Sequence, residues 1–157
     1  MRSHAKRALI YADHEVASDG RQTVKRRRPH YLHMTGIDDR TATVDELKKT
    51  VQDFCEERDW DQFHDPKELA IGIVTEAAEL LEPFRFQTPE RCREMLADPV
   101  RGAHLRDELA DVLYFTLRFA QLNGIDLTAA LTVKLAEDAA HYPVDKARGC
   151  RAKYSDL

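Results

Sequence analysis

The chain has 157 residues, of which 33% are charged, six are glycine and six are proline. This length allows one domain with its own core, and the composition favours a mostly helical fold. The net charge of −4 is uneven, because residues 1–33 carry +5 and residues 34–157 carry −9. An acidic main body argues against a surface that binds nucleic acid and suits a protein that holds cations.

The sequence favours a cytoplasmic location without a membrane anchor. No run of 18 or more apolar residues is present, so no membrane span is predicted. The N-terminus is basic but lacks the apolar core that is typical of a secretory signal. Cys55, Cys92 and Cys150 are an odd number and form no CxxC pair. We therefore expect reduced thiols rather than a disulfide, redox or zinc site.

Residues 1–43 differ from the rest of the chain. They include the basic cluster VKRRRPHYLH and show no lasting hydrophobic period. We interpret this cluster as solvated rather than as a nucleic-acid-binding arm. The segment MTGIDDRTATVDEL, from Met34, resembles the natural start of a small cytosolic protein, so residues 1–33 are interpreted as an upstream extension or an overcalled start. We expect a disordered extension over residues 1–43 and a folded domain over 44–157.

Two helices are predicted in the first half of that domain. Thr43 and Glu46 form a capping-box pattern ahead of an apolar stripe, which predicts a helix that ends near Arg58. After the loop DWDQFHD, Asp65 caps a second helix with proline at its first position. This helix is expected to end near Glu82, because a proline follows.

Three further helices are predicted in the second half. Thr88 caps a short one, and Asp98 with Pro99 begins a long one that ends at Asn123–Gly124. Asp126 caps a last helix, and Pro143 ends it. The basic tail that follows is expected to lie on a surface. No strand pair is evident. The sequence therefore predicts an all-α helical bundle of about four to five helices.

Two pairs of carboxylates stand out on these helices. Glu76 and Glu79 lie in the apolar stretch IVTEAAELLE, and Glu108 and Asp111 lie in the equally apolar long helix. Each pair has i, i+3 spacing, which places both side chains on one helix face. Four carboxylates near a core are costly unless a cation compensates them. Carboxylate ligands suit Mg²⁺ or Mn²⁺, and Mg²⁺ in turn suggests a phosphate substrate; solvated surface pairs remain the alternative.

The last helix offers a third group. Lys134, Asp138 and His141 share one face, and Tyr142 follows. Lys134 facing the carboxylates would bind phosphate oxygens or pair with a carboxylate. An exposed Lys134–Asp138 helix pair is the alternative that spacing leaves open.

The segments ERDWDQFHDPKELA, EAAELLEPFRF, DELADVLYF and KLAEDAAHYP together resemble a MazG-like nucleotide pyrophosphohydrolase. That family belongs to the all-α NTP pyrophosphatase superfamily, and the likeness is greatest to its dCTP-pyrophosphatase-like branch. The match covers roughly residues 44–157. It implies a helical fold completed as a homodimer or dimer of dimers. It also implies Mg²⁺-dependent hydrolysis of nucleoside triphosphates, with dCTP or modified dNTPs as candidates, to the monophosphate and pyrophosphate.

The resemblance also implies roles for individual residues. Four carboxylates become metal ligands, and we assign Glu79 in addition as the group that accepts a proton from the attacking water. The remaining assigned residues bind the nucleotide, with Trp60 near the base unless it is a core tryptophan. The metal ligands are Glu76, Glu79, Glu108 and Asp111, and the substrate-binding residues are Trp60, Phe63, His64, Phe86, Lys134 and Tyr142.

Some positions depart from the pattern of the branch. Val51 stands where dCTP-selective relatives carry His, Phe86 where Trp is frequent, Asp138 where Asn is common, and His141 where Arg or Lys is common. These changes put the selectivity for dCTP in doubt but leave the metal ligands intact. A helical interaction or regulatory module that has lost activity is the alternative function.

Overall fold

The computed structural model describes residues 36–156, so our expectation of disorder over residues 1–35 lies outside the described residues. Residues 36–43 lead into the first helix of the described part of the chain through a turn in which the Thr41 N–H donates to the Asp38 carbonyl at 3.0 Å. No strand occurs among residues 36–156. The predicted all-α class is confirmed.

The helix bounds follow the predicted caps closely. The α-helices are α2 (Val44–Glu56), α3 (Pro66–Leu81), α4 (Pro89–Ala97), α5 (Pro99–Leu122), α6 (Leu127–His141) and the short α7 (Val144–Ala147). The 3₁₀ turns are η2 (Asp61–Phe63), η3 (Glu82–Phe84) and η4 (Tyr154–Asp156). Each of α2 to α6 begins after the capping residue that the sequence indicates: Thr43, Asp65, Thr88, Asp98 and Asp126.

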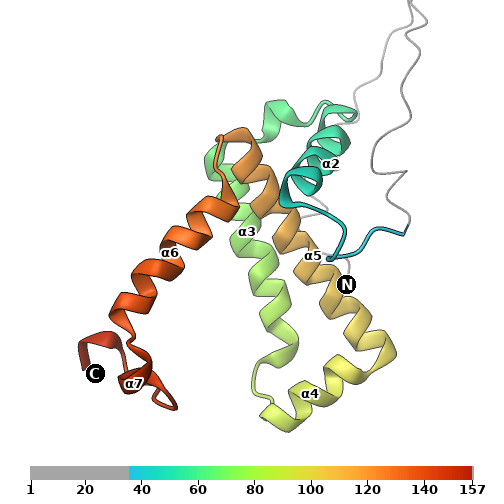
Figure 1. Ribbon diagram of the computed structural model, residues 1–157. Helices are drawn as coiled ribbons and strands as arrows, with labels where there is room; N and C mark the ends of the chain where they lie inside the picture. Colours follow the sequence, from blue (N-terminus) through green and yellow to red (C-terminus); the bar gives the residue numbers. More distant parts are fainter. Residues whose placement is uncertain (1–35, 157) are drawn as a thin grey trace, which may run out of the picture.

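The antiparallel pair α3 and α5 forms the centre of the molecule (Figure 1). Gly72 on α3 allows the close approach, because a Cβ at this position would lie 2.5 Å from Cδ1 of Phe115. Helix α2 packs on α5, where the Cys55 sulfur lies 3.0 Å from the Tyr114 hydroxyl oxygen. The buried apolar side chains are Cys55, Leu69, Met95, Leu105, Phe115, Leu117 and Ala120.

Helix α4 closes the far end of the pair. Asp98 is both the last cap of α4 and the first cap of α5, so one residue separates the two helices. Gly102, on the first turns of α5, brings the helices close, because a Cβ there would lie 2.5 Å from the Leu96 carbonyl oxygen. The result is a tight corner between α4 and α5.

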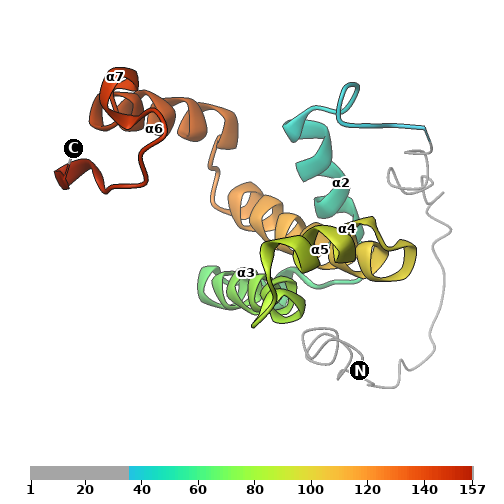
Figure 2. The same ribbon diagram turned by 90° about the horizontal axis from the view of Figure 1, so that it is seen from below.

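Helix α6 leaves the bundle, and both views show it running away from α3 and α5 with α7 at its far end (Figures 1 and 2). The C-terminal tail folds back on the end of this helix, where Tyr154 stacks on His141 with ring centroids 4.8 Å apart. Leu131, Val133 and Leu135 are 58–60% exposed. A soluble monomer rarely leaves such an apolar helix uncovered.

Candidate metal and nucleotide site

Three of the four predicted metal ligands converge between α3 and α5. Glu76, Glu79 and Glu108 each offer a carboxylate oxygen, and these oxygens lie within 4.8 Å of one another. The i, i+3 spacing brings the two α3 residues together, and the α3–α5 packing adds the residue from α5. Glu76 is 2% exposed and Glu108 is 4% exposed, whereas Glu79 is half-buried. The apolar setting that the sequence indicates is therefore present.

Asp111 lies one turn further along α5 and is half-buried. It does not belong to the group whose ligand atoms lie within 4.8 Å of one another. Its role as a fourth ligand remains a prediction.

The donor set fits a hard divalent cation. Three carboxylates lie close together, and two of them have lost nearly all contact with water. A buried ion that is poorly compensated costs several kcal/mol, so a cation between these carboxylates would offset an unfavourable free energy. Oxygen-only ligands match Mg²⁺ or Mn²⁺ better than zinc, which favours His and Cys. A bound Mg²⁺ would supply charge neutralisation for phosphate oxygens and a water of lowered pKa.

His104 adds a neighbour to this group that our sequence interpretation missed. Its Nδ1 lies 3.3 Å from Oε1 of Glu108, one helical turn away, and its side chain is 61% exposed. The i, i+4 spacing from Glu108 is the signal that would have found it.

The loop that contains η2 carries three of the predicted nucleotide-binding residues. Trp60 is half-buried and meets the rings of Phe54 and His64 edge-on, with centroids 5.7 Å and 6.5 Å apart. Phe63 is 49% exposed, whereas His64 is only 7% exposed. Trp60 thus combines the two alternatives of the sequence analysis, since part of its ring packs on α2 and part remains accessible.

Arg118 on α5 holds this loop and was not singled out from the sequence. It is 0% exposed. Its Nε donates to Nδ1 of His64 at 3.1 Å, its Nη1 donates to the Gln121 side-chain oxygen at 2.5 Å, and its Nη2 pairs with the Asp61 carboxylate. Its position three residues after Phe115 places it on the buried face of α5, which helical periodicity could have indicated.

The environment of His64 sets its protonation. Burial lowers the pKa of this imidazole, and the charge of Arg118 lowers it further against the opposing effect of Asp61. Because Nδ1 accepts the hydrogen bond, the proton of the neutral ring lies on Nε2. This Nε2 is buried and has no hydrogen-bond partner among the residues that the structure describes.

The residues predicted on α6 lie apart from the carboxylates of the same chain, because α6 runs away from α3 and α5 (Figure 2). Lys134 donates to Asp138 at 2.7 Å, which is the exposed helix pair considered as an alternative above, and this hydrogen bond raises the pKa of Lys134. Tyr142 is 39% exposed and meets Tyr154 edge-on. Their assignment to the nucleotide remains a prediction.

Phe86 stands out by its exposure. It is 95% exposed and has a φ of 61°, a left-handed conformation that is uncommon for a bulky residue. The guanidinium carbon of Arg85 lies 5.3 Å from its ring centroid. Such an exposed aromatic ring is available to a nucleotide or to another subunit, and its assignment as a pocket wall remains a prediction.

Comparison with known proteins places the chain in a family. The profile of the MazG-like family matches residues 71–157. The dCTP pyrophosphatase 1 of Bos taurus is 34% identical over 115 residues, which cover 73% of this chain and 68% of the relative, and that of Homo sapiens is 33% identical over the same length. A pyrophosphatase from Archaeoglobus fulgidus has a similar structure, with a TM-score of 0.61 and 30% identity over 68% of this chain and 98% of the other.

The chain therefore belongs to the MazG-like family, as the resemblance in its sequence implied. Among the described residues, no helix is both long enough and apolar enough to cross a membrane.

Proposed function

We propose that the protein is a Mg²⁺-dependent nucleoside triphosphate pyrophosphohydrolase, with deoxynucleoside triphosphates, including dCTP or modified dNTPs, as its substrates. Water attacks the triphosphate, and the products are the nucleoside monophosphate and pyrophosphate. The observation that carries the proposal is the convergence of Glu76, Glu79 and Glu108 within 4.8 Å between two packed helices. The names of its relatives support the same reaction.

The three carboxylates have different parts in this proposal. Glu76 and Glu108 are almost fully buried and hold the cation, with Asp111 as a further candidate ligand. Glu79 belongs to the same group but is half-buried, so solvent reaches it more readily. A carboxylate next to both cation and water is suited to accept the proton of the attacking water. We therefore retain Glu79 as the proposed general base.

The loop held by Arg118 is the proposed base pocket. Trp60 offers a flat ring for stacking, an interaction of about 1–3 kcal/mol per base in single-stranded nucleic acid complexes. Phe63 is half-exposed beside it. His64 has a hydrogen-bond donor at Nε2 that is buried and has no partner among the described residues, and such a donor suits an acceptor on a base edge.

We further propose that the active form is a homodimer or a dimer of dimers. Leu131, Val133 and Leu135 leave α6 apolar on more than one side, and no other described helix packs extensively on it. A second copy of the chain would cover this surface. It would also bring Lys134 and Tyr142 to a carboxylate group that they do not reach in their own chain.

An inactive helical interaction module remains the second candidate, since the exposed apolar surface of α6 also suits a partner protein. The test is pyrophosphate release from a panel of canonical and 5-substituted dNTPs and NTPs, with Mg²⁺ and with a chelator. Chelator-sensitive release from at least one nucleotide supports the enzyme, and the ranking identifies the base that Val51 and Phe86 favour. Absence of release from every nucleotide would favour the interaction module.

A further inference from the structure

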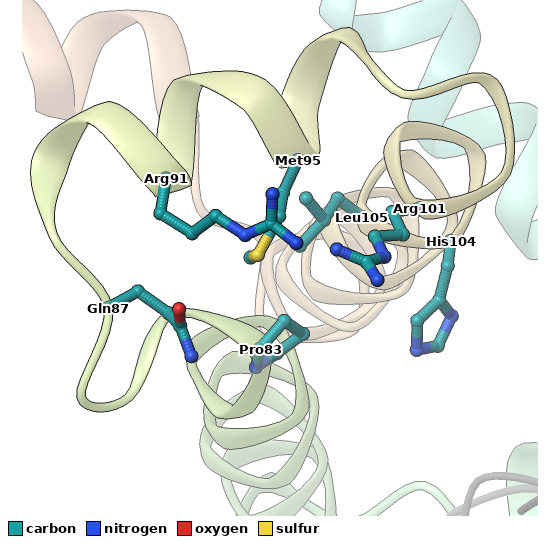
Figure 3. Close-up of a pocket in the computed structure, with 7 residues that line it drawn as sticks. All are labelled: Pro83, Gln87, Arg91, Met95, Arg101, His104 and Leu105. Carbon is teal, nitrogen blue, oxygen red and sulfur yellow. The ribbon is translucent and has the colours of Figure 1, made fainter.

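A concave site that none of the clustered carboxylates lines lies at the corner where α4 meets the α3–α5 pair (Figure 3). This corner cavity has a volume of about 420 Å³. Met95 and Leu105, which are 6% and 3% exposed, form part of its apolar lining. Its polar lining consists of Gln87, Arg91, Arg101 and His104.

The charge of the cavity is one-sided. Arg91 from α4 and Arg101 from α5 extend their guanidinium groups into the same space (Figure 3). None of the described residues that line the cavity is acidic. Both guanidinium groups are charged at every physiological pH, so an anion in the cavity would be attracted by both of them.

Two carboxylates lie near the arginines, those of Asp98 and Glu94, and each already accepts hydrogen bonds. As the cap of α5, Oδ1 of Asp98 accepts hydrogen bonds from the N–H groups of Val100 and Arg101, at 3.0 Å and 2.8 Å. Glu94 accepts a hydrogen bond from Nη1 of Arg91 at 2.7 Å, which leaves the other N–H donors of this guanidinium for a ligand. Within residues 36–156, Arg101 forms no side-chain ion pair at contact distance, although its charge, like that of Arg91, helps to lower the pKa of Asp98.

The fold fixes the positions of the two backbone segments that carry the arginines. Only Asp98 separates α4 from α5, and Gly102 lets the Leu96 carbonyl approach α5 closely. Arg91 and Arg101 are therefore attached to a corner with little freedom to open. Both side chains are exposed, and the guanidinium fork of each suits phosphate oxygens, to which arginine binds in bidentate fashion.

The cavity is also next to the carboxylate group. His104 lines the cavity, and its Nδ1 lies 3.3 Å from Oε1 of Glu108. An anion in the cavity would thus lie about one turn of α5 from the cation held by Glu108. We propose that the corner cavity is a binding site for a phosphate oxyanion, separate from the carboxylates.

Two sources share this chemistry. The oxyanion belongs either to a substrate or product of the reaction, as the terminal phosphates of a triphosphate or released pyrophosphate, or to a separate phosphate-bearing effector. The first source rests on the proposed function. The oxyanion site itself does not, because its residues are distinct from the metal ligands.

The test is calorimetric titration of the full chain with inorganic phosphate and with pyrophosphate, in a chelator that keeps the carboxylates free of divalent cations. We expect the double variant Arg91→Gln/Arg101→Gln to bind at least tenfold more weakly than the wild type. Arg93→Gln is the matched control, because Arg93 lies on the same helix, pairs with Glu90 at 2.8 Å and does not line the cavity. Equal binding by all three proteins, or no binding by the wild type, would overturn the proposal.

Further variants protect the test against loss of folding and separate the two sources. If the double variant unfolds at a much lower temperature than the wild type, Arg101→Gln alone is titrated instead, with an expected loss of threefold or more in phosphate affinity.

To identify the source of the oxyanion, the wild type is saturated with Mg²⁺ and a non-hydrolysable α,β-methylene dNTP. If the nucleotide occupies the cavity, phosphate no longer binds, and Arg101→Gln raises KM severalfold more than it lowers kcat.

If a separate effector is the ligand, phosphate binds together with the nucleotide analogue and Arg101→Gln leaves KM unchanged. Failure of the proposed function would look different from failure of this site. A protein that releases no pyrophosphate from any nucleotide would still bind phosphate in chelator through Arg91 and Arg101.

Discussion

Nε of Arg118 donates a hydrogen bond to Nδ1 of His64 at 3.1 Å, and this contact joins the long helix α5 to the aromatic loop in front of α3. It makes His64 a neutral ring with its proton on Nε2. The same guanidinium also reaches Asp61 in this loop and Gln121 on its own helix, so one buried side chain ties the loop to α5 at two residues.

Replacing Arg118 by Met should destabilise the fold. The substitution keeps much of the buried volume but removes donors from His64, Gln121 and Asp61. We expect a loss of about 2–4 kcal/mol in the free energy of unfolding, less than for a fully buried ion pair because Asp61 is half-exposed. Urea unfolding at matched protein concentration measures it. Arg106→Met, at an exposed position on the same helix, is the control and should change stability by less than about 0.5 kcal/mol.

The lowered pKa of His64 predicts a pH dependence of stability. An unfolded histidine titrates near pH 6.5, whereas folded His64 binds its proton only at lower pH. The unfolded state therefore binds more protons in this range, and the free energy of unfolding should fall as pH decreases from about 7.5 through 6.5 towards 5.5. The measurement is urea unfolding across this range for the wild type and His64→Gln. The variant should show a shallower slope, and parallel slopes would contradict the assignment.

Glu79→Ala should abolish hydrolysis and leave the fold largely intact. Glu79 is half-buried, so its truncation creates little strain, but it removes one of three clustered carboxylates and the proposed proton acceptor. We expect a fall in kcat of at least about 10²-fold. Glu82→Ala, at the exposed C-terminal cap of the same helix, is the control and should retain activity. Unchanged turnover of Glu79→Ala at saturating Mg²⁺ would refute the role.

The apolar surface of α6 predicts that a charged variant will dissociate. Leu131 and Leu135 lie one helical turn apart and are 60% and 58% exposed. The double change to Glu should shift the sedimentation coefficient towards that of an 18.1 kDa monomer. Glu137→Lys changes the charge of the same helix at a position that is 61% exposed and lies on the opposite side from Leu131 and Leu135, so it should leave the assembly unchanged. A wild-type chain that already sediments as a monomer at every concentration would contradict the proposed assembly.

Sequence reasoning was most successful where the determining interactions are local. The caps at Thr43, Asp65 and Asp98 depend on residues two or three positions away, so the helix starts were predicted correctly. The i, i+3 spacing of Glu76 and Glu79 was likewise sufficient to place them together. The all-α class follows from the same short-range signals.

Contacts between distant segments could not be predicted in this way. The bond from Arg118 to His64 spans 54 positions, and no local pattern specifies it. The divergence of α6 from the bundle depends on how the chain leaves α5 at Gly124, where φ is 63°, rather than on the composition of α6. The corner cavity combines residues from different elements of the chain. The sequence predicted the helices α4 and α5 but not that their side chains meet at one cavity.

The missing side chain at Gly72 has a consequence for the choice of metal. Gly72 sits one turn before Glu76, and Phe115 fills the space that a Cβ would need. A larger residue there would push α3 and α5 apart and widen the gap between Glu76 and Glu108. Mg²⁺ requires shorter ligand distances than Ca²⁺, about 2.1 Å against 2.3–2.6 Å. In the proposed metal site, the preference for a small over a large cation would therefore depend on a residue that carries no ligand atom.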